Sequence, residues 1–328
     1  MNPGSGTVRP VRPSSDFVVG SPSPRLMRKT LVLLLLVGLL GFAAACGGDD
    51  DEAAPETSAP TEATDTGSAV EEPDPCAKDQ LETVVDGSLT IATDNPAFPP
   101  WFQDADGAPW DPTTPPTGLG YEAAVADAVA AQLGFTPDEV RWVVVPFNNV
   151  FKPGPKDFDF DINQVSYLPG RDEAVDFSDS YYDVEQAVVT LKGSEFAGAT
   201  SLAELKGAKL GAQVGTTSYQ AILDLIQPDQ DPAVFDTNND AITAMKNEQI
   251  DGIVVDFPST GYITNVQVPD STVVGRLPAG DEYFGLVFEE GNPLRDCANE
   301  AIAALHEDGS IEQFQEEWIN TSAPPVLE

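Results

Sequence analysis

Apolar and polar positions alternate in two different periods along this chain. Short apolar runs typical of buried strands are followed by segments in which apolar residues recur at helical spacing. In residues 121–134 this spacing predicts a helix with one apolar face, formed by Tyr121, Ala124, Val125, Ala128, Val129 and Leu133. We predict strands at residues 88–94, 141–145, 158–162 and 186–191.

The alternation starts again in the middle of the chain. It predicts helices at residues 201–207, 217–226, 240–249 and 258–264, with strands at 209–214, 252–256 and 272–277 between them. The end of the chain adds a strand at 283–288 and helices at 292–309 and 310–319. This order predicts an α/β protein with largely parallel sheets, which bind ligands at the carboxyl ends of their strands.

The N-terminal region has the pattern of an export signal. Met27–Cys46 contains a basic start, an apolar run too short to span a bilayer, and small residues that end at a cysteine. The stretch FAAAC resembles a bacterial lipobox, in which Cys46 becomes the lipidated first residue, although Ala43 replaces the usual leucine. We predict a signal over residues 1–45, with Met27 as a possible start. A plain secretory signal with an incidental cysteine is the alternative.

Residues 46–75 are rich in acids, Pro, Ser and Thr and nearly lack large apolar side chains. Such a segment buries too little surface to offset its chain entropy, so we predict a disordered tether between the lipid anchor and the folded part. The whole chain has 16 Lys and Arg against 54 Asp and Glu, for a net charge of −38. This charge argues against a nucleic-acid partner, because phosphate binding needs clustered cations.

Two cysteines remain besides Cys46. Cys76 begins the folded part and Cys297 lies on a predicted helix near its end. Since disulfides persist in exported proteins, these two cysteines are either paired or both buried as thiols.

Three predicted strand ends carry polar groups suited to a ligand. Arg171 lies on a turn after one strand, Thr217 opens a helix after Gly215, and Asp256 directly follows an apolar run. An arginine fork with hydroxyl and backbone donors suits a carboxylate, and a carboxylate suits an ammonium, so together they predict a site for a zwitterion. Taken singly, each has a plainer interpretation: Arg171 as a surface ion pair, and Thr217 and Asp256 as helix caps.

Several sequence blocks, in this order, resemble one known family. They are TDNPAFPPWF, GLGYEAAVADAVA, YLPGRDEAVDFSDSYYD, LAELKGAKLGAQVGTTS, IDGIVVD, EYFGLVFEEGNPL and ALHEDGSIEQFQEEW. Over roughly residues 86–320 the chain is similar to the extracellular solute-binding proteins, family 3, of ABC transporters for polar amino acids. The resemblance implies a two-lobed periplasmic-binding-protein-like fold of type II with two crossover hinge segments. It places 76–190 and 280–321 in lobe 1 and 191–279 in lobe 2, with crossovers near 188–192 and 278–283. Because Cys76 and Cys297 then share a lobe, it favours the disulfide.

The resemblance also implies roles for individual residues. Arg171 and Thr217 correspond to the groups that hold a ligand's α-carboxylate, and Asp256 to the acid that holds its α-ammonium. The remaining ligand contacts that it implies are Gln164 and Ser166, the aromatic pair Phe98 and Phe147, and Asp94, with Trp101 flanking the pocket. Core packing is the alternative for Phe98 and Phe147.

The turn before Arg171 departs from the family pattern Thr-Pro-Glu-Arg. Leu168 and Gly170 stand where threonine and glutamate are usual. Leucine cannot cap a helix and glycine loosens a turn, so we expect a less rigid support for Arg171, at a local cost of about 1–2 kcal/mol.

The function that follows is capture of a polar amino acid outside the membrane and its delivery to an ABC permease, without catalysis or a cofactor. We expect a monomer held on the extracellular face of the cell membrane by lipid alone. The alternatives are an enzyme on the same fold, similar to arogenate or cyclohexadienyl dehydratase, and a ligand-sensing module. The single histidine, His306, offers little for an enzyme. Asp157, Asp159 and Asp161 alternate along a predicted strand, which leaves a cation site as a further possibility.

Overall fold

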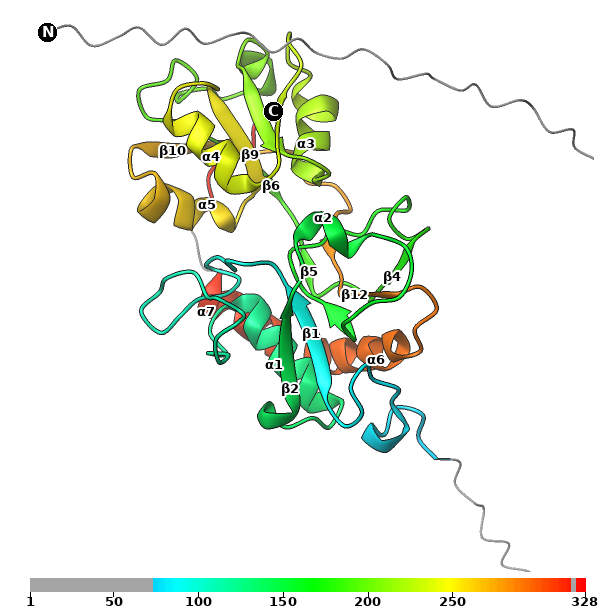
Figure 1. Cartoon of the computed structure of the whole chain (residues 1–328). Coiled ribbons are helices and arrows are strands. Elements are labelled where there is room, and N and C mark those ends of the chain that lie inside the picture. Colours follow the sequence, from blue (N-terminus) through cyan, green and yellow to red (C-terminus); the bar gives the residue numbers. More distant parts are fainter. Residues whose placement is uncertain (1–72, 320–322) are drawn as a thin grey trace, which may run out of the picture. The chain divides into compact units, whose positions relative to one another are not determined.

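The computed structural model describes residues 73–319 and 323–328, all within one unit, Ala69–Glu328 (Figure 1). The predicted signal, Cys46 and most of the predicted tether lie outside the described residues. No helix in the described part is long and apolar enough to cross a membrane.

The first lobe is built on a five-stranded sheet. Its strand order is β2 (Val140–Val144), β1 (Leu89–Thr93), β3 (Phe160–Asp161), β12 (Val287–Glu289) and β4 (Val175–Phe177). Helices α1 (Tyr121–Gln132), α6 (Leu294–Glu307) and α7 (Ser310–Trp318) pack on one another, and their apolar side chains share one core with β1 and β3 (Figure 1). A smaller apolar cluster on β4 and β12 lies beside α2 (Phe147–Val150).

The second lobe has its own five-stranded sheet. The strand order is β10 (Ser271–Arg276), β6 (Gln186–Leu191), β9 (Gly252–Asp256), β7 (Leu210–Gln213) and β8 (Ala233–Phe235). Successive residues of β6 and β9 point to opposite faces, so Val188 and Val254 enter one core, whereas Val189 and Ile253 enter the other. The helices of this lobe are α3 (Thr217–Ala221), α4 (Asn238–Lys246) and α5 (Ser259–Tyr262).

Shorter helical turns complete the two lobes. Single 3₁₀ turns lie at Lys78–Gln80, Pro137–Glu139 and Leu202–Leu205. Two π-helical turns, Ile222–Ile226 and Ile263–Gln267, directly continue α3 and α5. The helices predicted at 217–226 and 258–264 are therefore present, but each changes its hydrogen-bond pattern halfway.

The prediction of two α/β lobes is confirmed, whereas the prediction of largely parallel sheets is wrong. β1 pairs in parallel with β2 and β3, and β7 with β8 and β9. However, β12 runs antiparallel to β3 and β4, and β6 runs antiparallel to β9 and β10. After each crossover, β6 and β12 are the first strands to join a five-stranded sheet, and each runs against the other strands of its sheet.

The first lobe boundary also differs from the expected one. Lobe 1 was expected to extend to Thr190, with a crossover at 188–192, but β6 already belongs to the second sheet from Gln186 onward. The first crossover therefore lies between β5 (Tyr182–Asp183) and β6. Strand β5 pairs with β11 (Tyr283–Phe284), so the two crossovers lie beside each other. The C-terminal residues return to the second lobe, where Val326 pairs with Arg276 and Leu327 is buried.

A disulfide joins Cys76 to Cys297 on α6, with an S–S distance of 2.03 Å. It links positions 221 residues apart and ties the start of the folded part to the core of the first lobe. Of the two states left open for these cysteines, the structure has the paired one.

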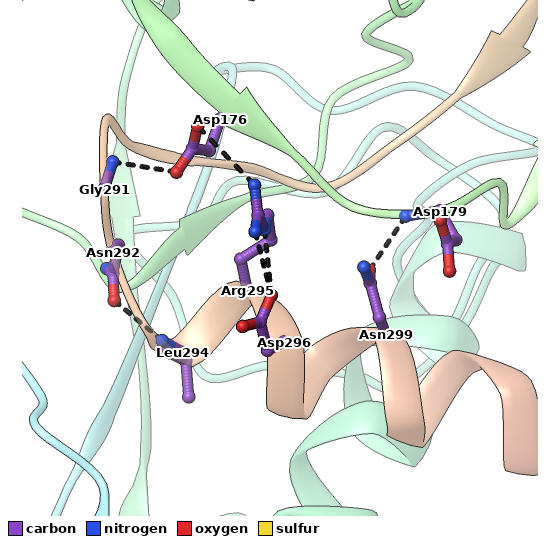
Figure 2. Close-up of polar contacts among 8 residues, drawn as sticks. All are labelled: Asp176, Asp179, Gly291, Asn292, Leu294, Arg295, Asp296 and Asn299. Carbon is purple, nitrogen blue, oxygen red and sulfur yellow. Dashed lines mark hydrogen bonds and ion pairs between the residues drawn. The ribbon is translucent and has the colours of Figure 1, made fainter. Parts of the chain in front are cut away.

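Polar contacts connect α6 and the residues just before it to β4 and to the loop after β4 (Figure 2). The Arg295 guanidinium lies 2.9 Å from Asp296 Oδ1 and 3.8 Å from Asp176 Oδ1. The Asp176 carboxylate also accepts a hydrogen bond from the backbone of Gly291, and Asn299 accepts one from the backbone of Asp179. These contacts connect the C-terminal helices to the strand that follows the Arg171 turn.

Candidate ligand-binding site

All eight residues expected to contact a ligand line one cavity between the two lobes. The first lobe contributes Asp94, Phe98, Phe147, Gln164, Ser166 and Arg171, and the second contributes Thr217 and Asp256. They come from the loops after β1 and β3, the turn before β4, the end of β9 and the starts of α2 and α3. The rest of the wall includes Asn163, Gln213, Thr216, Ser218, Thr237 and Asn238.

Trp101 does not flank this cavity. Its side chain is 1% exposed and packs edge-on against Tyr121, Tyr182 and Phe284 in the first-lobe core. Its indole Nε1 donates to Ser259 Oγ of the second lobe at 2.9 Å. The prediction that Trp101 flanks the pocket is therefore wrong, because its indole packs among the aromatic rings of the first-lobe core.

Arg171 is almost fully buried, with 9% of the residue exposed. Its Nη1 donates to the Ser166 carbonyl at 2.5 Å and its Nη2 to the Gly215 carbonyl at 2.7 Å, and its guanidinium carbon lies 4.3 Å from the Phe151 ring centroid. Burial lowers the pKa of Arg171 to about 10, against the effect of nearby acids, so the group is still cationic at neutral pH. The contacts are those of a buried cation and exclude the surface ion pair.

The turn that carries Arg171 is held by its backbone. The carbonyl of Leu168 accepts hydrogen bonds from Arg171 N at 2.9 Å and Asp172 N at 3.1 Å, and the carbonyl of Arg171 accepts from Ala174 N and Val175 N. Residues 169–174 form turns rather than a regular helix. The guanidinium is therefore aimed by two carbonyls and by aromatic rings, while Leu168 is left 38% exposed.

Thr217 is the first residue of α3, but Thr216 is its cap. Thr216 Oγ1 accepts a hydrogen bond from Tyr219 N at 3.2 Å, which satisfies one of the free donors of the first turn. Thr217 Oγ1 instead lies 3.3 Å from Ser166 Oγ in the opposite lobe. Thr216, and not Thr217, is therefore the helix cap of α3. Thr217 lines the cavity instead.

Asp256 ends β9 with its carboxylate buried. Its Oδ1 accepts a hydrogen bond from Gln186 Nε2 at 2.7 Å, so the carboxylate is held by β6. Burial, and then the charge of Glu282, raise the pKa of Asp256 to about 7, while the Gln186 bond and Arg171 act against this rise. A buried carboxyl with such a pKa gains stability when a cation approaches it.

Asp94, Phe98 and Phe147 also line the cavity, and the Phe147 ring centroid lies 5.7 Å from the Arg171 guanidinium carbon. Asp94 accepts hydrogen bonds from Asn95 N at 2.7 Å and Phe147 N at 3.3 Å, and burial raises its pKa. Phe98 lies 6.0 Å, centroid to centroid, from Tyr262 of the second lobe. Both Phe98 and Phe147 are half-buried and line the cavity, so they are not simple core residues.

Gln164 is positioned by a buried acid that the sequence did not indicate. Its backbone has φ 49°, and its N–H donates to Glu122 Oε1 at 2.7 Å, while its side-chain amide donates to Glu122 Oε2. Tyr181 OH also donates to Glu122 Oε1, at 2.6 Å. The helical pattern placed Ala124 and Ala128 on the apolar face of α1, but the structure buries Glu122, whose pKa burial raises to about 7.

Asp157, Asp159 and Asp161, which alternate along the sequence, have three different environments. Asp159 accepts from Val84 N and Thr90 N, at 2.7 and 2.6 Å, and so fixes the start of β1, whereas Asp157 is exposed. Asp161 is fully buried, its pKa is raised well above the usual range by burial, and neither of its oxygens has a hydrogen-bond partner within residues 73–319 and 323–328. In the same residues no group of three or more His, Cys, Asp or Glu is placed to hold a metal ion.

Two further polar residues of the site were missed. Gln186 opens β6, and its Oε1 accepts from Ser218 Oγ at 2.7 Å while its Nε2 donates to Asp256. Glu282 precedes β11, and its Oε1 accepts from Ser166 Oγ at 2.6 Å. The one sequence signal for Gln186 was its position as a polar residue at the start of an otherwise apolar strand. Nothing in the sequence pattern distinguished Glu282 from the other acidic residues.

Comparisons with known proteins agree on one family. Residues 89–321 match the bacterial extracellular solute-binding proteins, family 3. The arginine-binding extracellular protein ArtP of Bacillus subtilis is 25% identical over 204 residues, which cover 61% of this chain and 77% of that protein. The putative ABC transporter arginine-binding protein 2 of Escherichia coli is 30% identical over 161 residues, covering 47% of this chain and 63% of its own length.

Solved structures of similar proteins have the same fold. An ancestral arginine-binding protein bound to arginine superposes with a TM-score of 0.59 at 27% identity, covering 71% of this chain and 99% of that structure. The ancestral amino acid-binding protein AncCDT-1, a precursor of cyclohexadienyl dehydratase, has a TM-score of 0.57 at 25% identity, covering 71% of this chain and 96% of that structure.

Proposed function

Since this chain belongs to family 3 of the bacterial extracellular solute-binding proteins, we propose that it binds a free amino acid in the cavity between its lobes and delivers it to an ABC permease. The observation that carries the proposal is the pairing of opposite charges across the cavity. Arg171 lines it from the first lobe and is buried, and Asp256 lines it from the second and is half-buried. A zwitterion with its carboxylate on Arg171 and its ammonium on Asp256 neutralises both groups at once.

The charges that line the cavity favour a cationic amino acid. Its ionisable side chains are Asp94, Asp256 and Arg171, so two carboxyl groups face one guanidinium. Asp94 lines the cavity and accepts hydrogen bonds from the backbone of Asn95 and Phe147, and its carboxylate suits a cationic side chain of the ligand. Several relatives are described as arginine-binding, so arginine is the first ligand to test, followed by lysine and glutamine.

The same proposal includes the membrane anchor. Cys46, as a lipidated first residue followed by the acidic tether, would hold a monomer on the extracellular face of the cell membrane. Labelling of the expressed precursor with a radioactive fatty acid tests this. Label in the wild type but not in Cys46→Ser supports the anchor, and equal label in both contradicts it.

A catalytic role is less well supported. His306 is exposed, and its Nε2 lies 3.0 Å from the Ser180 carbonyl rather than in the cavity. The solved precursor of cyclohexadienyl dehydratase is itself described as amino acid-binding, which favours binding as the basal activity of this fold. Recovery of every added amino acid, prephenate and arogenate unchanged after long incubation is the result that we expect.

Isothermal titration calorimetry against the twenty amino acids tests the proposed function directly. We expect at least one ligand with a Kd in the micromolar range or below, with a cationic amino acid bound most tightly. Small-angle scattering should show compaction at saturation, because a ligand that contacts both lobes stabilises the closed arrangement. Absence of any heat of binding across the series would refute the proposal.

A further inference from the structure

Glu282 lies outside the cavity lining and contacts Ser166, which is expected to hold the ligand, and Gln186, which holds Asp256. Its Oε1 accepts a hydrogen bond from Ser166 Oγ at 2.6 Å, and its two oxygens lie 3.3 and 3.4 Å from Gln186 Nε2. The same Nε2 donates to Asp256 Oδ1 at 2.7 Å. One amide group therefore bridges two carboxylates, and neither the family pattern nor the sequence indicated this arrangement.

The directions of these hydrogen bonds follow from the chemistry of the groups. Ser218 Oγ donates to Gln186 Oε1 at 2.7 Å, which fixes the amide with its NH₂ toward the two acids. An ionised carboxylate only accepts, so the single hydrogen of the Ser166 hydroxyl points to Glu282. In its 3.3 Å contact with Thr217 Oγ1, Ser166 Oγ can then only accept, and its remaining lone pair suits an ammonium and repels a carboxylate.

We propose that Glu282 is a positioning residue of the ammonium subsite, which turns Ser166 Oγ into an acceptor and, with Asp256, concentrates negative charge on one side of Gln186. This role rests on the proposed function, because it assumes a ligand whose ammonium lies beside Asp256. Glu282 does not line the cavity, so it acts through Ser166 and Asp256 rather than by contact with the ligand.

The paired acids also couple ligand binding to a proton. The charged and titratable groups around Asp256 come from each neighbouring element: Glu282 before β11, Arg171 from its turn, Glu122 from α1 and Tyr182 from β5. With a pKa of about 7, the Asp256 carboxyl is protonated in about half of the molecules at pH 7. An ammonium ligand binds the ionised form, so binding at pH 7 should release roughly half a proton per ligand.

Two variants separate the charge of Glu282 from its hydrogen bond. Glu282→Gln keeps an oxygen that can accept from Ser166 but removes the charge, whereas Glu282→Met removes both at similar size. We expect Glu282→Gln to raise the Kd for arginine roughly 3- to 10-fold and Glu282→Met roughly 10- to 100-fold, the range of one lost charge-assisted hydrogen bond. The matched control is Asp281→Asn, which removes the same charge from an exposed side chain one residue earlier. It should change the Kd less than twofold.

Proton release provides a readout that a purely structural role would not move. Titrations of the wild type in buffers with different ionisation enthalpies should give about half a proton released at pH 7, with the same value for Asp281→Asn. In Glu282→Gln the released fraction should fall toward zero, because the pKa of Asp256 drops when the neighbouring charge is lost.

The outcomes distinguish this inference from the proposed function. Equal Kd and equal proton release in Glu282→Gln and Asp281→Asn would overturn the role of Glu282 while leaving amino-acid binding intact. A wild type that binds none of the twenty amino acids would instead refute the proposed function, and the role of Glu282 with it. The comparison requires that the variants melt at the same temperature as the wild type. If Glu282→Met unfolds, Glu282→Asp replaces it, because aspartate keeps the charge on a shorter side chain.

Discussion

Replacing Arg171 by methionine should abolish ligand binding while leaving most of the fold intact. Methionine fills a similar volume beside Phe147 and Phe151 but offers neither charge nor donors. A ligand carboxylate would lose up to two charge-assisted hydrogen bonds of about 1.5–3 kcal/mol each. The loss of about 3–6 kcal/mol corresponds to a Kd increase of roughly 10² to 10⁴-fold.

The effect of this substitution on stability should be much smaller. The guanidinium donates to the carbonyls of Ser166 and Gly215, but its own burial opposes the gain from these bonds, as its lowered pKa indicates. We expect a net loss of about 1–3 kcal/mol and a melting temperature lower by several degrees. Calorimetric titration with arginine and thermal unfolding followed by circular dichroism measure the two quantities.

Arg295→Met is the matched control for this experiment. Arg295 belongs to the same lobe, its side chain is 40% exposed, and it pairs with Asp296 at 2.9 Å (Figure 2). Since exposed ion pairs contribute about 0.2–1 kcal/mol, this variant should bind like the wild type. If Arg171→Met bound within threefold of Arg295→Met, the assignment of Arg171 as the carboxylate-binding group would be wrong.

Three further expectations concern pH, the disulfide and the C-terminus. Because the pKa of Asp256 is about 7 and the ligand binds its ionised form, the affinity should fall roughly tenfold per pH unit below pH 6.5 and be highest near pH 8, where the ligand is still an ammonium; a Kd that stays level from pH 5.5 to 8 would contradict this. The double substitution of Cys76 and Cys297 by serine should lower the free energy of unfolding by about 2–5 kcal/mol, since the bridge closes a loop between positions 221 residues apart. Denaturant unfolding with and without reductant checks it, and reductant should not affect the variant. Leu327→Ala should cost about 2–5 kcal/mol in the same assay, because Leu327 is 1% exposed and packs against Gly275 and the second-lobe core. Stability equal to that of the wild type would show that the tail does not contribute to this core.

Local sequence patterns determined where ligand-binding groups would lie. Thr217 and Asp256 follow or end the parallel strands β7 and β9, and the carboxyl ends of such strands meet at one edge of a sheet, so their proximity could be anticipated from the pattern. Arg171 lies on a turn of the other lobe, and its place in the same cavity depends on how the lobes pack. The two lobes were implied by the resemblance to the family, and the restart of the alternation in the middle of the chain fits the inserted second lobe.

Only the tertiary structure decided which groups support that site. Glu122, Gln186 and Glu282 act through hydrogen bonds to residues 31 to 116 positions away, and a helical or strand period carries no information about such partners. Periodicity also carries no information about the lobe boundary before β6 or about the antiparallel pairing of β6 and β12. Strand pairing depends on which edge is free when the chain enters a lobe, whereas periodicity reports only which face of an element is buried.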